Sequence, residues 1–366
     1  MIAALKGLIC AGATLPDGAP WRARGLALLR REIARQVLPD GGHVERNPAR
    51  HMAVLRDLID IRAALGDAQG AARDELGATI AAMAGWLRMM RLGDGGLGLF
   101  NGASEEEAWR VDLILQRAGG SRRPPAEAPE SGFHRLAAGR TVVLVDTGTL
   151  PAPGLDGDAH AGTLSFEVSA GRQRLIVNCG ARAHDPAWRR AQRATAAHST
   201  LGVRDTNSSD PRAGAGRRAR IVRATYHGAE GCAWLDAAHD GYARSHGVIH
   251  RRRLYLAADG FDLRGEDRLE PTRSRCAGQE FAIRFHLHPA VRASLAQGGD
   301  SVLLGLPKGA GWRLRAVGAA LALEPSIYLG RAGEIRRTQQ VVLRGACAPD
   351  GACVKWALRR LDGKRT

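Results

Sequence analysis

The segment GDAHAGTLSFEVSAGRQRLIVNCG, residues 157–180, decides the fold of the larger part of this chain. It contains two apolar runs, LSFEV and RLIV, on either side of a glycine-containing turn. Short runs of this kind, bounded by turn residues, predict neighbouring antiparallel strands. His160 opens the segment and Asn178 follows its last strand, although a plain β-sandwich needs neither. A second histidine, His198, lies in TAAHSTL at 195–201.

The same two-residue alternation continues along the chain after residue 131. Examples are TVVLVDTG, RQRLIVNCG, FAIRFHLHP and TQQVVLRG, which are short, separated by turns and interrupted by few helical candidates. Many short alternating strands with frequent turn signals are typical of an antiparallel β-sandwich.

The first third of the chain has helical periodicity instead. Residues 21–38, 47–65 and 71–92 are amphipathic, and a shorter stretch, EEEAWRVDLILQRA, follows them. Asn47 is a good candidate N-cap with Pro48 at the first helical position. Helices joined by short turns predict a bundle or an α/α toroid.

The clearest boundary is GGSRRPPAEAPES at 119–131, which is rich in Pro and Gly and has no periodicity. We therefore expect a helical domain at 1–118, a linker at 119–131 and a β-sandwich at 132–366. The predicted fold class is α+β and multidomain.

The net charge of +16 suits an anionic partner such as nucleic acid, an acidic polysaccharide or a membrane surface. The alternative is compositional bias, because only four of the 53 basic residues are Lys. The arginines are scattered, and no nucleic-acid-binding module is present, so we expect no nucleic-acid partner. We also expect no transmembrane segment and no secretory signal, because no apolar run is long enough and no basic region precedes the first one.

The six cysteines are widely spread and include no CxxC pair. Cys347 and Cys353 bracket a turn and could close a hairpin disulfide. The other four are expected to be free thiols.

Three clusters of polar residues are candidates for chemistry. Two histidines at strand ends, His160 and His198, with Asn178 between them, could hold zinc or could be hydrogen-bonded structural residues. The loop DGGHVERNPARH at 40–51 gathers basic side chains, and it could be catalytic or a capped, solvated connection. These basic side chains are His43, Arg46, Arg50 and His51.

The third cluster is HDGYARSHGVIHRRRLYL at 239–256. Tyr242 lies near Arg244 and His246, and nearby positive charge lowers the pKa of a tyrosine enough for proton transfer. Strand alternation offers another interpretation, in which the arginines line a solvent-exposed face. The residues on that side are Val248, His250, Arg252 and Leu254.

Together these motifs resemble the heparinase II/III-like polysaccharide lyases over nearly the whole chain. The resemblance is carried by DGGHVERNP, HAGTLSFEVSAGRQRLIVNCG, TAAHSTL and DGYARSHGVIHRRRLYLAADGFDLRGEDRL. It implies the C-terminal part of an α/α toroid followed by a multi-sheet antiparallel sandwich. It also implies β-elimination at a uronic acid, in which a base removes the C5 proton, neighbouring groups neutralise the carboxylate, and an acid protonates the leaving oxygen.

The resemblance extends to individual positions. His160 and His198 match the zinc-ligand histidines of the family, whereas Asn178 stands where many members have an Asp ligand. Asp158 and Arg50 stand where the lyases have a catalytic His and a Tyr. The family's catalytic Asn-His pair is expected on helices upstream of Met1.

We therefore expect a polysaccharide lyase-like protein that acts on uronate-containing glycans. The alternative is a non-catalytic acidic-glycan-binding or envelope polysaccharide assembly protein, and family resemblance favours a periplasmic or envelope location. The candidate catalytic residues are His43, His51, Tyr242 and His246. The candidate substrate-binding residues are Arg46, Arg50 and Arg244. The candidate ligands of a structural zinc ion are His160, Asn178 and His198.

Overall fold

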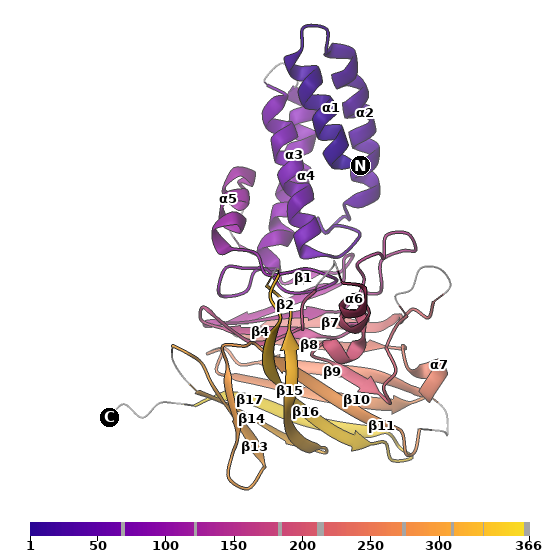
Figure 1. Cartoon of the computed structure of the whole chain (residues 1–366), viewed down its shortest axis with the longest axis vertical. Coiled ribbons are helices and arrows are strands. Elements are labelled where there is room, and N and C mark those ends of the chain that lie inside the picture. Colours follow the sequence, from indigo (N-terminus) through magenta and orange to yellow (C-terminus); the bar gives the residue numbers. More distant parts are fainter. Residues whose placement is uncertain are drawn as a thin grey trace.

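The computed structural model describes residues 1–66, 70–120, 123–181, 185–210, 216–272, 276–308, 311–331 and 333–361. A tall group of helices stands on a wide β part (Figure 1). This arrangement confirms the predicted α+β fold class. Residues 121 and 122 of the expected linker and residues 362–366 of the expected sandwich lie outside the described ranges.

The helices form antiparallel pairs. Glycine allows the first pair to approach closely, because a Cβ on Gly12 would lie 2.5 Å from the backbone nitrogen of Arg22. Asn47 caps the third helix as predicted, with its Oδ1 accepting from the amides of Ala49 at 2.9 Å and Arg50 at 3.1 Å. The helices are α1 (Ile2–Thr14), α2 (Ala19–Gln36), α3 (Pro48–Ala64), α4 (Gly70–Met89) and α5 (Ala108–Ala118). Among the described residues, no helix combines the length and apolar character needed to cross a membrane.

The first sheet has the strand order β1-β2-β3-β4-β5-β11-β16-β15, and β6 pairs with β11. The pairings between these strands are antiparallel. Its strands are β1 (Glu127–Ala128), β2 (Phe133–Ala138), β3 (Thr141–Asp146), β4 (Phe166–Ala170), β5 (Gln173–Val177), β6 (Leu201–Val203), β11 (Glu280–Leu287), β15 (Ala320–Tyr328) and β16 (Arg336–Ala346).

The second sheet has the order β12-β13-β14-β17-β10-β9-β8-β7 and is also antiparallel. The short helix α7 (Ala243–His246) lies between β8 and β9 of this sheet, whereas α6 (Pro186–Arg193) lies between β5 and β6 of the first sheet. Its strands are β7 (Ile221–Ala229), β8 (Cys232–His239), β9 (Val248–Leu256), β10 (Asp262–Pro271), β12 (Arg292–Leu295), β13 (Ser301–Gly305), β14 (Gly311–Val317) and β17 (Ala352–Arg360).

Two hydrophobic cores hold the molecule together. Between the sheets, Phe166 stacks on Trp356 with ring centroids 5.6 Å apart, and Phe285 meets the same indole edge-on at 5.0 Å. The helical core extends into the first sheet, because Phe133 and Leu144 are buried with the helices. The helical part and the sandwich therefore share one continuous packed region.

The solvent-face interpretation of 248–254 is wrong for Arg252, whose side chain is only 1% exposed. Its Nε donates to Asp267 at 2.7 Å, and His250 and Trp356 bond to the same carboxylate at 2.8 and 2.9 Å. Burial alone would raise the pKa of Asp267, but Arg252 and His250 lower that pKa below its ordinary value. The buried guanidinium of Arg252 on β9 is tolerated because its partner, Asp267, lies on the neighbouring strand β10.

All six cysteines are free thiols, so the hairpin disulfide considered for Cys347 and Cys353 is not formed. Cys347 is buried and Cys353 is exposed.

Candidate functional site

The corner that contains His160 and His198 lies where the loop after β3 meets the 3₁₀ turn Thr195–Ala197. His160 Nδ1 and His198 Nε2 are 3.1 Å apart, and the two rings are nearly perpendicular. The carbonyl of Ala194 can only accept, so His198 Nδ1, 2.8 Å away, carries the proton and His198 Nε2 accepts from His160. Gly162 makes room for this contact, because a Cβ there would lie 2.7 Å from His198 Cδ2.

Both histidines are buried, at 7% and 2% exposure, and are held neutral. Burial lowers the pKa of His198 to about 4, against the weaker opposing effect of the Ala194 carbonyl. Burial also lowers the pKa of His160 well below its usual value, and His198, Arg193 and Arg189 add to that effect.

Asn178 braces the backbone beside this pair. Its Oδ1 accepts from the amide of Ser199, the residue after His198, at 3.0 Å, and its Nδ2 donates to the carbonyl of Leu99 at 3.2 Å. The amide nitrogen of Asn178 donates to Glu167 at 2.8 Å. Asn178 therefore joins the corner to the loop after α4, and both of its side-chain polar atoms are already bonded.

These donors do not fit a zinc site. Structural zinc is usually held by four Cys, His or carboxylate ligands. The corner offers two imidazoles, which already bond to each other, and an amide whose oxygen is taken by a backbone N–H. Within the described ranges, no cluster of three His, Cys, Asp or Glu side chains could hold a metal ion. We therefore derive no chemistry through a metal here.

The helical loop residues are mostly bonded within the protein. His43 and His51 are 1% and 0% exposed, and burial lowers their pKa values to about 4 and about 3. His51 Nε2 donates to the carbonyl of Met83 at 2.9 Å, and its ring lies 4.4 Å from the ring of Trp86.

Arg46, expected to bind substrate, instead ties the helical loop to the sandwich. It donates to the carbonyls of Ser131 at 2.6 Å and Thr149 at 2.7 Å and forms an ion pair with Asp146. Its side chain is 7% exposed, so this guanidinium has no free donor face for a ligand. Arg50 differs, because its side chain is 55% exposed and makes a single ion pair with Glu45.

The third cluster lies apart from the helical loop, and its tyrosine belongs to the core between the sheets. Tyr242 is 0% exposed, and its hydroxyl donates to the carbonyl of Leu201 at 3.0 Å. Burial raises the pKa of Tyr242 above its usual value, against the lowering that nearby arginines were expected to cause. His246 is half-buried between Gln279 and Thr206. Arg244 is exposed and lines a different pocket, beside Arg217 and Asp240.

The solvent-accessible side chains beside the corner are a carboxylate, Asp158, and a guanidinium, Arg189, and neither is a histidine. Asp158 is 42% exposed on its side chain and lies 3.4 Å from Arg189. A carboxylate at this position repels the carboxylate of a uronic acid rather than neutralising it.

Two buried residues that connect the corner to the helices were missed in the sequence. Asn101 accepts from the amide of His160 at 3.1 Å and donates to the carbonyl of Arg46 at 3.0 Å. Glu167 accepts from the amides of Leu99 at 3.1 Å and Asn178 at 2.8 Å. The Asn-Gly turn at 101–102 was a usable signal, because Asn101 has a positive φ of 49°. Glu167 gave none, since it occupies an ordinary alternating position in a strand.

Family comparisons agree with this architecture. Residues 1–91 match the heparinase II/III N-terminus model, and residues 120–357 match the heparinase II/III-like C-terminal model. FtsZ-localized protein C of Caulobacter vibrioides (strain NA1000 / CB15N) is 34% identical over 378 residues, which cover 99% of this chain and 65% of that protein.

Solved structures show the same fold at low sequence identity. A mutant heparan sulfate lyase from Pedobacter heparinus has a TM-score of 0.81 and 16% identity, covering 99% of this chain and 60% of that one. A heparinase III gene product has a TM-score of 0.79 and 17% identity, covering 98% and 59%. This chain therefore spans about 60% of the length of these enzymes.

Proposed function

This chain belongs to the heparinase II/III-like family, and from that premise we propose that it binds an acidic polysaccharide without cleaving it. The observation that carries the proposal is the burial of three of the four candidate catalytic residues, His43, His51 and Tyr242, whereas His246 is half-buried. A general base must come within hydrogen-bonding reach of the C5 proton. Tyr242 and His51 are both 0% exposed, and each bonds to a backbone carbonyl.

Binding of an acidic chain is supported by charge and by the relatives. The net charge of +16 attracts polyanions at long range. The structural neighbours of this chain include an enzyme named as a heparan sulfate lyase, and heparan sulfate is an acidic glycan. The fold is therefore suited to this class of ligand, while the altered corner favours recognition over reaction.

The test measures binding and turnover together. We expect the protein to bind heparan sulfate or polygalacturonate in calorimetric titrations. Incubation with the same chains should produce no ultraviolet absorbance from unsaturated uronate. Absence of binding to both polymers would contradict the proposal.

Uronate β-elimination is the second candidate, favoured by the overall fold and by the retained His160–His198 pair. It predicts a rise in absorbance that is slowed by a Tyr242→Phe substitution. Such a result would replace the binding proposal with a lyase function. The variant must keep the unfolding temperature of the unaltered chain for this comparison, because Tyr242 is a core residue.

We also propose a cell-associated location, supported by the relative named FtsZ-localized protein C. A fluorescent fusion should colocalise with labelled FtsZ in cells that express both. Uniform fluorescence throughout the cell would oppose this location.

A further inference from the structure

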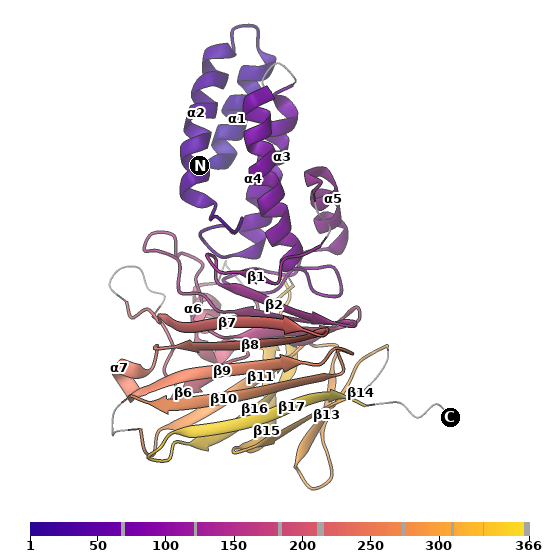
Figure 2. The same cartoon turned by 180° about the vertical axis from the view of Figure 1, so that it is seen from behind.

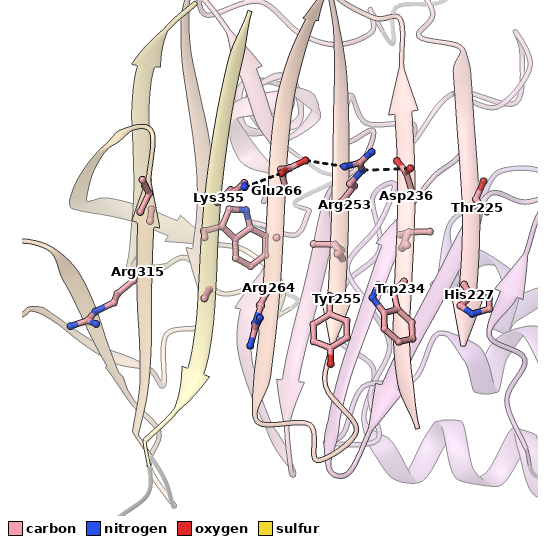
Figure 3. Close-up of a pocket in the computed structure, with 17 residues that line it drawn as sticks. Thr225, His227, Trp234, Asp236, Arg253, Tyr255, Arg264, Glu266, Arg315 and Lys355 are labelled. Carbon is pink, nitrogen blue, oxygen red and sulfur yellow. Dashed lines mark hydrogen bonds and ion pairs between the residues drawn. The ribbon is translucent and has the colours of Figure 1, made fainter. Parts of the chain in front are cut away.

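The outer surface of the eight-stranded sheet is open to solvent and carries two ordered rows of side chains. In Figure 2 strands β7, β8, β9 and β10 face the viewer, and none of the described helices lies in front of them. Figure 3 shows the rows crossing these strands and continuing over β17 and β14. Between the rows is a depression of about 640 Å³.

The first row, which we call the ring row, combines aromatic rings with guanidinium groups. Trp234 lies 5.9 Å from His227 and 5.0 Å from Tyr255, measured between ring centroids. Arg264 Cζ lies 5.7 Å from the Tyr255 ring centroid. Consecutive members are direct cross-strand partners, so the row is straight. In strand order it contains His227, Trp234, Tyr255, Arg264, Ala357 and Arg315.

The second row, the ionic row, runs parallel to the first. Arg253 Nη1 is 3.3 Å from Glu266, and Arg253 Nε is 3.6 Å from Asp236. Lys355 extends the row at 3.9 Å from Glu266 and is 70% exposed on its side chain. In strand order the row contains Thr225, Asp236, Arg253, Glu266, Lys355 and Val317.

This pairing of rows matches the chemistry of an acidic sugar chain. The apolar face of a pyranose ring packs on exposed aromatic rings such as Trp234, which is 38% exposed. Guanidinium groups bind carboxylate or sulfate through several N–H donors. Arg264 and Arg315 are 55% and 59% exposed, and each also pairs with a carboxylate of the chain, Asp262 at 2.7 Å and Asp300 at 3.4 Å. The carboxylates of Asp236 and Glu266 can accept hydrogen bonds from sugar hydroxyls.

Charge on the surrounding face also favours an anionic ligand. The basic side chains outnumber the acidic ones around both rows. The basic set is Arg223, Arg251, Arg253, Arg264, Arg268, Arg315, Lys355 and Arg359; the acidic set is Asp236, Asp262, Glu266, Glu270 and Asp300.

We propose that this sheet face, rather than the His160 corner, is where the chain holds an acidic polysaccharide. This inference rests on the proposed glycan-binding function and assigns it a location. A nucleic acid fits less well, because the ionic row would place two carboxylates against closely spaced phosphates. A bilayer surface fits less well, because Val317 and Trp234 are the only exposed large hydrophobic side chains of the described residues in the two rows.

The experiment compares sheet-face variants with a matched pair elsewhere. One variant is Trp234→Ala with Tyr255→Ala, and another is Arg264→Glu with Arg315→Glu. The control is Trp109→Ala with Arg110→Glu on α5, where Trp109 is 62% exposed and Arg110 Cζ lies 5.4 Å from its ring centroid. Thermal unfolding identifies the variants that keep the native fold.

Each chain is titrated with heparan sulfate, with neutral dextran, with single-stranded DNA and with vesicles of anionic phospholipid. We expect both sheet-face variants to bind heparan sulfate roughly tenfold more weakly or worse, because stacking and charge are each lost. The α5 control should bind like the unaltered chain, and dextran should bind weakly to all.

The outcomes separate the two proposals. If the unaltered chain binds no acidic glycan, the proposed function fails. If it binds and both folded sheet-face variants bind equally well, only the sheet-face inference fails. If the same substitutions instead abolish tighter binding to DNA or to vesicles, the face serves a different polyanion and the glycan assignment is overturned.

Discussion

Buried neutral histidines are prominent at the scale of single residues. His51 is the clearest, because its ring is packed against Trp86, its Nε2 bonds to the Met83 carbonyl, and its Nδ1 has no hydrogen-bond partner. Burial lowers its pKa from 6.5 to about 3, outweighing the raising effect of the Met83 carbonyl, and His43 lowers it further. Charging this ring would carry a desolvation cost that its bond to the Met83 carbonyl does not offset.

The sign of the resulting pH dependence follows from proton binding. Below pH 6.5 the unfolded chain protonates His51, whereas the folded chain leaves it neutral until the pH approaches 3. Acid therefore favours the unfolded state, and stability falls as the pH is lowered through this window. At pH 5 the preferential protonation of His51 in the unfolded chain lowers the free energy of unfolding by about 2 kcal/mol. Urea unfolding at pH 8 and at pH 5 should show this loss.

His51→Gln provides the comparison, because its amide can donate toward the Met83 carbonyl but does not titrate. The variant should lose less stability than the unaltered chain between pH 8 and pH 5. Equal losses in the two proteins would show that His51 is not responsible for the acid sensitivity.

The identity of these residues was readable from the sequence, but their burial was not. His43, His51 and Tyr242 stand in polar, glycine-containing segments that are typical of exposed catalytic loops. Their exclusion from solvent depends on Trp86, Leu201 and other partners far along the chain. Local pattern carries no information on such long-range contacts, so it could not separate catalytic side chains from structural ones.

At the scale of elements, the start of α3 is predictable and measurable. Asn47 Oδ1 accepts from two free N–H groups in the first turn of α3. We expect Asn47→Ala to reduce the free energy of unfolding by about 1 kcal/mol, as for other N-cap deletions. Urea titration followed by circular dichroism measures this change.

Asn47→Asp is the control, because it keeps the acceptor oxygen and places a negative charge at the positive end of the helix dipole. It should unfold near the midpoint of the unaltered chain. An alanine variant as stable as the aspartate variant would argue against a capping role.

The helices and strands follow from periodicity, whereas their spatial order does not. The amphipathic stretches at 21–38, 47–65 and 71–92 correspond to α2, α3 and α4 with ends shifted by a few residues. The placement of β11 between β5 and β16 joins strands far apart in sequence. No turn signal specifies such a pairing, and it places β11 beside β6, the strand that follows His198.

At the scale of the whole molecule, Arg46 couples the helical part to the sandwich. It lies in the loop before α3, with a positive φ of 55°, and its side chain reaches across to the end of β3. Asp146, its ion-pair partner, is fully buried, and burial raises the pKa of that carboxyl against the lowering effect of Arg46. Removing Arg46 alone therefore leaves an uncompensated buried acid.

We expect Arg46→Met to reduce the free energy of unfolding by about 3–5 kcal/mol, because it leaves the buried carboxylate of Asp146 without a counterion. Arg46→Met with Asp146→Asn should recover part of this loss, since the amide needs no counterion. Arg50→Met is the surface control, with an expected change below about 0.5 kcal/mol, because its ion pair with Glu45 is exposed. Urea unfolding followed by tryptophan fluorescence and by circular dichroism measures all three. If Arg46→Met were no more destabilising than Arg50→Met, the Arg46 bridge would add nothing to the other contacts between the two parts, such as the packing of Phe133 and Leu144 and the Trp86–Ser131 hydrogen bond.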